Sequence, residues 1–173
     1  MISLDDFLFF LDDVLDGMVR IVVQLGDDRA GRRPAINSVN SPYATLAHCI
    51  GVMDFWGGHV IAGRQSVRDR DAEFRESGSV ADLVSRTQRA RQQLAVDLAT
   101  IEPAAAPRGA PLHEDDASLP LGSTQGGALL HLYSELAIHR GHMEVCRDLL
   151  LSSTVPTVVG VATPQPDSRY RRD

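Results

Sequence analysis

The chain has 173 residues, 43% of them hydrophobic, which suits a single domain with its own core. Its 23 acidic and 17 basic residues give a formal net charge of −6, so it lacks the basic surface that nucleic-acid binding requires. The first residues are acidic where a signal peptide would be positive, and no run of about 18 apolar residues occurs. We therefore expect a soluble, cytoplasmic protein with no membrane or nucleic-acid partner.

Two helices are predicted in the first third of the chain. Apolar residues recur at spacings of three and four over residues 4–25, which predicts an amphipathic helix that begins after Ser3 and ends at Gly26. The order Ser41-Pro42 is typical of a helix start, because serine caps the helix and proline suits its first turn. This second helix is expected to run over residues 42–62.

Two further helices are predicted after it. Ser79 is the expected cap of a helix over residues 80–98, with an apolar stripe on one side and arginine and glutamine on the other. A loop rich in proline, alanine and aspartate follows over residues 102–123, and the last helix is expected from Ser123 or Thr124 to about Leu151.

The predicted fold follows from these elements. Four long helices with no convincing strand indicate an all-α protein, a four-helix bundle with long crossover loops. We expect the bundle to occupy residues 1–151 and to be followed by an irregular tail over residues 152–173. Bundles build metal sites from side chains that point inward from facing helices, so the inward-facing ionisable residues matter most.

Four such residues lie on the last helix. At about 100° per residue, Glu135, His131, His139 and His142 all fall within the arc of the apolar residues. A buried carboxylate without a partner is costly, so something must satisfy Glu135. On the second helix the inward arc contains two histidines and two aromatic residues: His48, Phe55, Trp56 and His59. His48 and His59 are separated by about 16 Å of helix rise and so cannot bind one ion.

These directions favour a metal site. Glu135 and His139, one turn apart, would supply two ligands and His48 the third, which suits zinc or a neighbouring transition metal and leaves one position open. Periodicity alone also allows His131 with Glu135, or Glu135 with His142. The structural alternative is an ordinary i, i+4 pair beside a core histidine. The remaining residues, His142, His131, His59, Phe55 and Trp56, would support the ligands or contact substrate.

Three segments resemble a known family. SPYATLAH (41–48), FWGG (55–58) and ELAIHRGH (135–142) look like the DinB-like superfamily of metal-binding bundles, over roughly residues 3–151. Many members bind metal through one histidine on the second helix and a His-x3-His pair. Glu135 replaces the first histidine of that pair, which resembles mycothiol S-transferases and the N-terminal domain of mycothiol-dependent maleylpyruvate isomerase. The resemblance therefore makes His48, Glu135 and His139 the ligands.

The segment LGSTQGGALLHLY (121–133) is similar to small, single-domain mycothiol S-transferases of actinobacteria. The sequence lacks the additional C-terminal domain associated with the isomerase, which favours the transferase. The absence of lysine, with arginine as the only strongly basic residue, is consistent with a GC-rich actinobacterial source.

The resemblance implies a metal-dependent thiol S-transferase with zinc, or alternatively nickel, as cofactor. Mycothiol would be held as a metal-bound thiolate and would attack an electrophilic substrate placed against Phe55 and Trp56. Cys49 and Cys146 are not needed for this chemistry and are expected to be small core residues. The alternatives are a metal-dependent hydrolase and a non-catalytic metal-binding stress or interaction protein. The electrophile, the native metal and the oligomeric state, including a homodimer, are left open.

Overall fold

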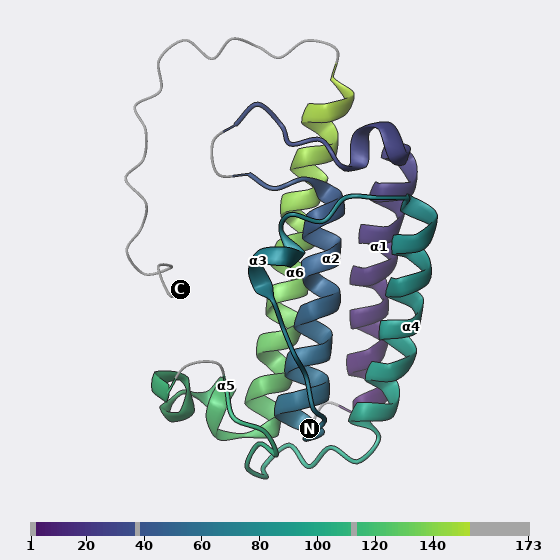
Figure 1. Ribbon diagram of the computed structural model, residues 1–173. Helices are drawn as coiled ribbons and strands as arrows, with labels where there is room; N and C mark the ends of the chain where they lie inside the picture. The colour runs from purple at the N-terminus through teal and green to yellow at the C-terminus, as the bar shows by residue number, and fades with distance from the viewer. Residues whose placement is uncertain (1–2, 37–38, 112–113, 153–173) are drawn as a thin grey trace.

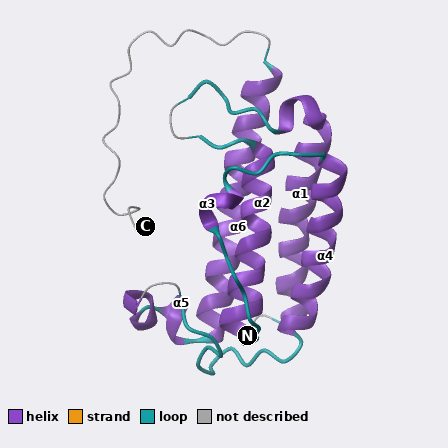
Figure 2. Cartoon of the chain, in the orientation of Figure 1, coloured by secondary structure: helices purple, strands orange, loops and turns teal. Residues whose placement is uncertain are grey.

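The computed structural model describes residues 3–36, 39–111 and 114–152. This part of the chain contains helices and no strand, which confirms the prediction of an all-α bundle (Figures 1 and 2). The bundle consists of four long elements: α1 (Leu4–Ala30), α2 (Pro42–Val52) with its π-helical continuation η1 (Met53–Ile61), α4 (Val80–Leu98) and α6 (Gln125–Leu151). Three short elements lie between them: α3 (Arg70–Glu73), the 3-10 helix η2 (Glu114–Ser118) and α5 (Pro120–Ser123).

The helices follow an up, down, down, up order (Figure 1). After α2 and η1 have descended, residues 62–79 return along the outside of the bundle, so that α4 descends parallel to α2. Residues 99–111 then cross the lower end, and α6 rises. Both α1 and the α2–η1 element pack against α4 and against α6. The two helices that carry the candidate ligands, α2 and α6, are therefore antiparallel neighbours.

The predicted helix starts are confirmed. Ser3, Ser41, Ser79 and Thr124 are the N-caps of α1, α2, α4 and α6, and the side chain of each accepts a hydrogen bond from a backbone N–H in the first turn. At the other end of α1, Gly26 has φ +64°, a conformation that glycine adopts at little cost. Regular α1 is interrupted there as predicted, but a further helical turn continues to Ala30.

The prediction of an uninterrupted α-helix over residues 42–62 was wrong in its second half. Residues 53–61 form a π-helix, in which each turn takes up more residues than in an α-helix. Rotation of about 100° per residue therefore does not hold beyond Val52. Gly57 and Gly58 in this segment allow Leu94 and the Arg64 guanidinium to approach the backbone where a Cβ would collide with them.

The core is formed by large apolar side chains from all four long elements. The largest of those that are fully buried are Leu11, Leu15, Met18, Leu46, Met53, Ile61, Leu83, Leu94, Leu98, Leu132, Leu136 and Met143. Cys49 and Cys146 are also buried and carry free thiols, which confirms their prediction as core residues. None of the helices in the described ranges has the length and apolar character needed to span a membrane.

The two crossover segments contain structure that periodicity did not predict. Residues 63–79 include α3, and they are anchored to the bundle by Arg64, whose Nη2 lies 2.7 Å from Asp54 Oδ1 and 3.0 Å from Asp97 Oδ2. The expected loop over residues 102–123 contains η2 and α5. The tail predicted over residues 152–173 lies, from residue 153 onward, outside the described residues.

Candidate metal centre

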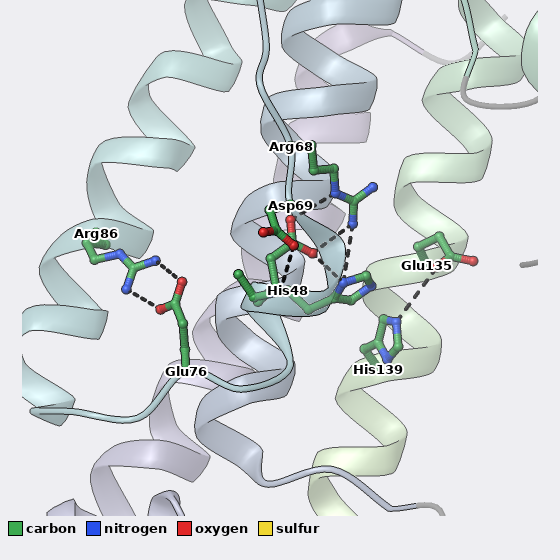
Figure 3. Close-up of polar contacts among 9 residues, drawn as sticks. His48, Arg68, Asp69, Glu76, Arg86, Glu135 and His139 are labelled. Carbon is green, nitrogen blue, oxygen red and sulfur yellow. Dashed lines mark hydrogen bonds and ion pairs between the residues drawn. The ribbon is translucent and has the colours of Figure 1, made fainter.

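Three candidate ligands meet between α2 and α6 (Figure 3). One ligand atom from each of His48, Glu135 and His139 lies within 4.8 Å of the others. His48 is only 3% exposed, whereas Glu135 and His139 are half-buried. Glu135 Oε2 is 3.7 Å from His139 Nε2, and the ring centroids of His48 and His139 are 4.8 Å apart. The structure thus brings together the residues that the sequence placed on two facing helices.

The donor set of this cluster fits a divalent transition metal. Two imidazole nitrogens and a carboxylate oxygen are ligands that zinc and its neighbours bind well. Two atoms that each lie about 2.1 Å from one ion are at most about 4.2 Å apart. In a tetrahedral site two such atoms are about 3.4 Å apart, so the widest separation in the cluster, up to 4.8 Å, would have to contract by up to about 1.4 Å, which side-chain rotation can supply. Three protein ligands would leave one position of a tetrahedral ion free.

His48 is oriented by a carboxylate from α3. Its Nδ1 lies 2.8 Å from Glu73 Oε2, and Arg68 donates to the same carboxylate from Nε, at 2.9 Å, and Nη2, at 3.1 Å. Phe74 stacks on the imidazole with a centroid distance of 4.3 Å. Arg68 Nη2 is also 3.2 Å from Nδ1. If Nδ1 carries hydrogen, both nitrogens are donors, and both donate to the Glu73 carboxylate rather than to each other. A hydrogen on Nδ1 would leave Nε2 of His48 as the acceptor.

The electrostatic environment keeps these groups in the protonation states that a metal requires. Burial lowers the pKa of His48, and this outweighs the opposite effect of its hydrogen bond to Glu73. Burial alone would raise the pKa of Glu73, but hydrogen bonds from His48 and Arg68 lower it overall. The nearby His139, with its Nε2 at 3.7 Å from Oε2, lowers the pKa of Glu135. At neutral pH, His48 is therefore a neutral imidazole and both acids are carboxylates.

Three of the predicted supporting residues, His131, Trp56 and Phe55, pack against one another. His131 is half-buried, and its ring meets the buried Trp56 edge-on at a centroid distance of 4.5 Å. Burial lowers the pKa of His131, so this imidazole is also neutral at pH 7. Phe55, likewise buried, packs edge-on against Trp56, and the Arg68 guanidinium lies 5.9 Å from the centroid of its ring.

Two predicted positions differ from the structure. His142 is exposed, so its placement inside the apolar stripe was wrong, although its ring centroid lies 5.9 Å from that of His139. His59 is half-buried at the end of the π-helix, where its Nδ1 is 2.9 Å from the Arg64 carbonyl and its ring packs against Phe55. Because the π-helix changes the rotation per residue, its direction could not be extrapolated from His48.

Sequence reasoning missed the three residues that surround His48 from the crossover: Arg68, Glu73 and Phe74. Glu73 is the last residue of α3, a four-residue helix too short to show periodicity, and Arg68 and Phe74 flank this helix. The only local signal is Asp69, whose side chain accepts a hydrogen bond from the Ala72 N–H and caps α3. That signal places a turn, but it does not indicate that Glu73 reaches α2.

Gly51 makes this contact sterically feasible and provides a test of it. A Cβ at Gly51 would overlap Oε1 of Glu73. We expect Gly51→Ala to displace Glu73 and to lower the free energy of unfolding by about 1–3 kcal/mol, the usual cost of overpacking. Urea unfolding of the metal-free protein measures the loss. Gly141→Ala is the matched control, because a Cβ there meets no atom within 4 Å; equal stability losses in the two variants would contradict the explanation.

The fold and the cluster define a class: an all-helical bundle with an inward-facing His, Glu, His set of metal-ligand type. A family model described as MST, mycothiol-S-transferase, matches residues 6–151, which include the whole cluster. The chain therefore belongs to the mycothiol S-transferase family, a family of enzymes, and the resemblance drawn from its sequence is confirmed. No curated protein and no solved structure matches the chain.

Proposed function

We propose that this protein is a metal-dependent S-transferase that joins mycothiol to an electrophilic carbon, with the ion held by His48, Glu135 and His139. The observation that carries the proposal is the convergence of three ligand atoms within 4.8 Å, inside the region that matches the transferase family. A divalent ion bound there, zinc or nickel, would lower the pKa of an incoming thiol and fix the position of its sulfur.

The protein side chains would then have distinct tasks. His48 and His139 contribute neutral donors, and the Glu135 carboxylate balances part of the charge of the ion. His131 lies one turn before Glu135 on α6, is half-buried and packs against the buried Trp56, and we place the acceptor molecule beside it. In the overall reaction the thiol would lose its proton and a sulfur–carbon bond would form at the acceptor. An activated halide would release its halide ion as that bond forms, whereas an α,β-unsaturated carbonyl compound would open its carbon–carbon double bond and take up a proton at the α-carbon.

The nucleophilic sulfur belongs to mycothiol in this proposal, so neither protein thiol is required. Burial raises the pKa of both thiols, that of Cys49 well above its ordinary value, which makes them poor nucleophiles at neutral pH. We expect the double variant Cys49→Ala, Cys146→Ala to keep its metal and its transfer rate while losing roughly 0.5–3 kcal/mol of stability. Loss of activity in a folded, metal-loaded double variant would instead indicate a nucleophile supplied by the protein.

A thiol screen tests the proposed activity directly. The protein, with and without added zinc, is incubated with mycothiol, bacillithiol, glutathione or no thiol, together with a panel of activated halides and α,β-unsaturated carbonyl compounds. Conjugate formation, followed by mass spectrometry, should depend on both mycothiol and metal. Zinc-dependent hydrolysis of esters or amides without any thiol would favour the hydrolase alternative, in which the ion activates water.

A further inference from the structure

We propose that Glu73, held by Arg68, is a positioning residue that fixes His48 in the Nδ1–H tautomer and so presents Nε2 to the ion. This inference rests on the proposed metal site and deepens it, because it assigns a task to a crossover segment that contributes no ligand. It extends the centre from two helices to a third element, α3, which reaches His48 from the outside of the bundle (Figures 1 and 3).

The Glu73 carboxylate is held by more than one partner. Its Oε1 accepts from Arg68 Nε at 2.9 Å, and its Oε2 accepts from Arg68 Nη2 at 3.1 Å and from His48 Nδ1 at 2.8 Å. The two bonds from the planar guanidinium fix the plane of the carboxylate, as in other two-point arginine–carboxylate pairs. The Arg68 side chain is only 7% exposed, so little water competes for these bonds.

The charges in this cluster also suit a role beside an ion. Arg68 and Glu73 neutralise each other, so the pair orients His48 without adding net charge to the centre. The Glu135 carboxylate then remains to balance the ion. The two hydrogen bonds between Arg68 and Glu73 would be enough if the pair only anchored the crossover. The third hydrogen bond, between Glu73 and His48 Nδ1, is not needed for anchoring.

The geometry restricts His48 in a second way. Phe74, the residue after Glu73, stacks on the imidazole at a centroid distance of 4.3 Å and an interplanar angle of 23°, which limits rotation of the ring. If His48 carried its hydrogen on Nε2 instead, that N–H would occupy the side of the ring needed for the ion. Nδ1 would then lie 2.8 Å from a carboxylate oxygen that cannot donate to it, and its donor among these groups would be Arg68 Nη2, at 3.2 Å, which already donates to Glu73. Glu73 and Phe74 together therefore determine which nitrogen is free and where it lies.

The tautomer is measured first, in metal-free wild-type protein. In a protein labelled with 15N-histidine, two-bond proton–nitrogen correlations distinguish Nδ1–H from Nε2–H, and the His48 signals are identified by their loss in His48→Gln. We expect His48 to be the neutral Nδ1–H tautomer at neutral pH. A predominant Nε2–H tautomer, or a charged ring, in the wild-type protein would overturn the proposal without recourse to any Glu73 variant.

The second measurement is zinc affinity, by competition with a chromophoric chelator. We expect Glu73→Ala to bind zinc about 10–100-fold more weakly and to show mixed His48 tautomers, on the scale found when the partner of a metal-binding histidine is lost. Glu73→Gln keeps an oxygen that can accept from Nδ1 and should recover much of that loss. Unchanged zinc affinity and tautomer in a folded Glu73→Ala protein, or a folded Glu73→Gln protein as impaired as Glu73→Ala, would overturn the proposal.

Glu76→Ala is the matched control. Glu76 lies in the same crossover, and its Oε2 pairs with Arg86 Nη1 on α4 at 2.6 Å, so it anchors the segment without contacting His48 (Figure 3). We expect wild-type zinc affinity and tautomer in this variant. A loss as large as that of Glu73→Ala would mean that anchoring alone matters and would contradict a positioning role. Absence of thiol transfer, with the predicted tautomer and affinities intact, would sink the proposed function but leave this inference standing.

Discussion

Replacing His48 or His139 with alanine should lower the affinity for zinc by at least about 10-fold, because each substitution removes one of three proposed protein ligands. Loss of groups that merely support a ligand costs roughly 10–100-fold, so loss of the ligand itself should be at least as severe. Elemental analysis after dialysis gives the occupancy, with about one ion per chain expected in the wild-type protein. Circular dichroism of the metal-free variants checks that the bundle still forms.

His142→Ala is the matched control for this experiment. His142 follows His139 on α6 and its ring is near, at 5.9 Å between centroids, but it is exposed and does not belong to the cluster. Its removal should leave occupancy close to that of the wild type. Full occupancy in both His48→Ala and His139→Ala would sink the assignment of the ligands, and a loss confined to His131→Ala or His142→Ala would revive the alternatives that helix angles left open.

Helix angles predicted that all three members of the cluster face inward, because they lie where ideal geometry holds, and the family resemblance then selected them from the alternatives. His48 is in the regular part of α2, and Glu135 and His139 are one turn apart in the uninterrupted α6. Their directions relative to the buried leucines were therefore readable from spacing. His59 lies beyond the change from α-helix to π-helix. The spacing of apolar residues does not reveal this change, so the direction of the His59 side chain could not be predicted.

His142 illustrates a different limit. Its angle on α6 is close to that of Glu135, but an angle gives only the direction of a side chain and not what covers it. Buried Met143 and Cys146 follow on the same helix, yet His142 itself is exposed to solvent. The solvent exposure of a side chain depends on the neighbouring helices and their connections, which are features of the tertiary structure.

Glu73 could not be found from sequence for the same reason. It follows His48 by 25 residues on a four-residue helix, and it reaches Nδ1 only because the crossover runs back along the bundle and Gly51 leaves space for its carboxylate. The helix starts, by contrast, depend on a serine or threonine and the few residues that follow it. All four predicted caps are confirmed because capping is a local interaction.

Adding mycothiol to the cobalt-substituted protein should produce a new near-ultraviolet sulfur-to-cobalt charge-transfer band that saturates with thiol. Zinc is spectroscopically silent, whereas cobalt reports a change of its ligands. Three protein ligands leave a tetrahedral ion one position short, and an incoming sulfur can fill it. The band should develop at lower thiol concentration as the pH rises from neutral to mildly alkaline, because binding of the sulfur releases the thiol proton.

The Glu135→Ala protein tests whether the band requires all three protein ligands and not merely bound cobalt. Without the carboxylate, His48 and His139 alone should not hold cobalt in the geometry that gives a saturable band, so we expect the band to be absent. The Cys49→Ala, Cys146→Ala variant should give the full band, which excludes a protein thiol as its source. If the spectrum of protein with cobalt held at His48 and His139 stays indifferent to mycothiol over this pH range, the ion does not accept the thiol. Transfer through a metal-activated sulfur would then be ruled out, and a non-catalytic protein with a structural metal site would be favoured instead.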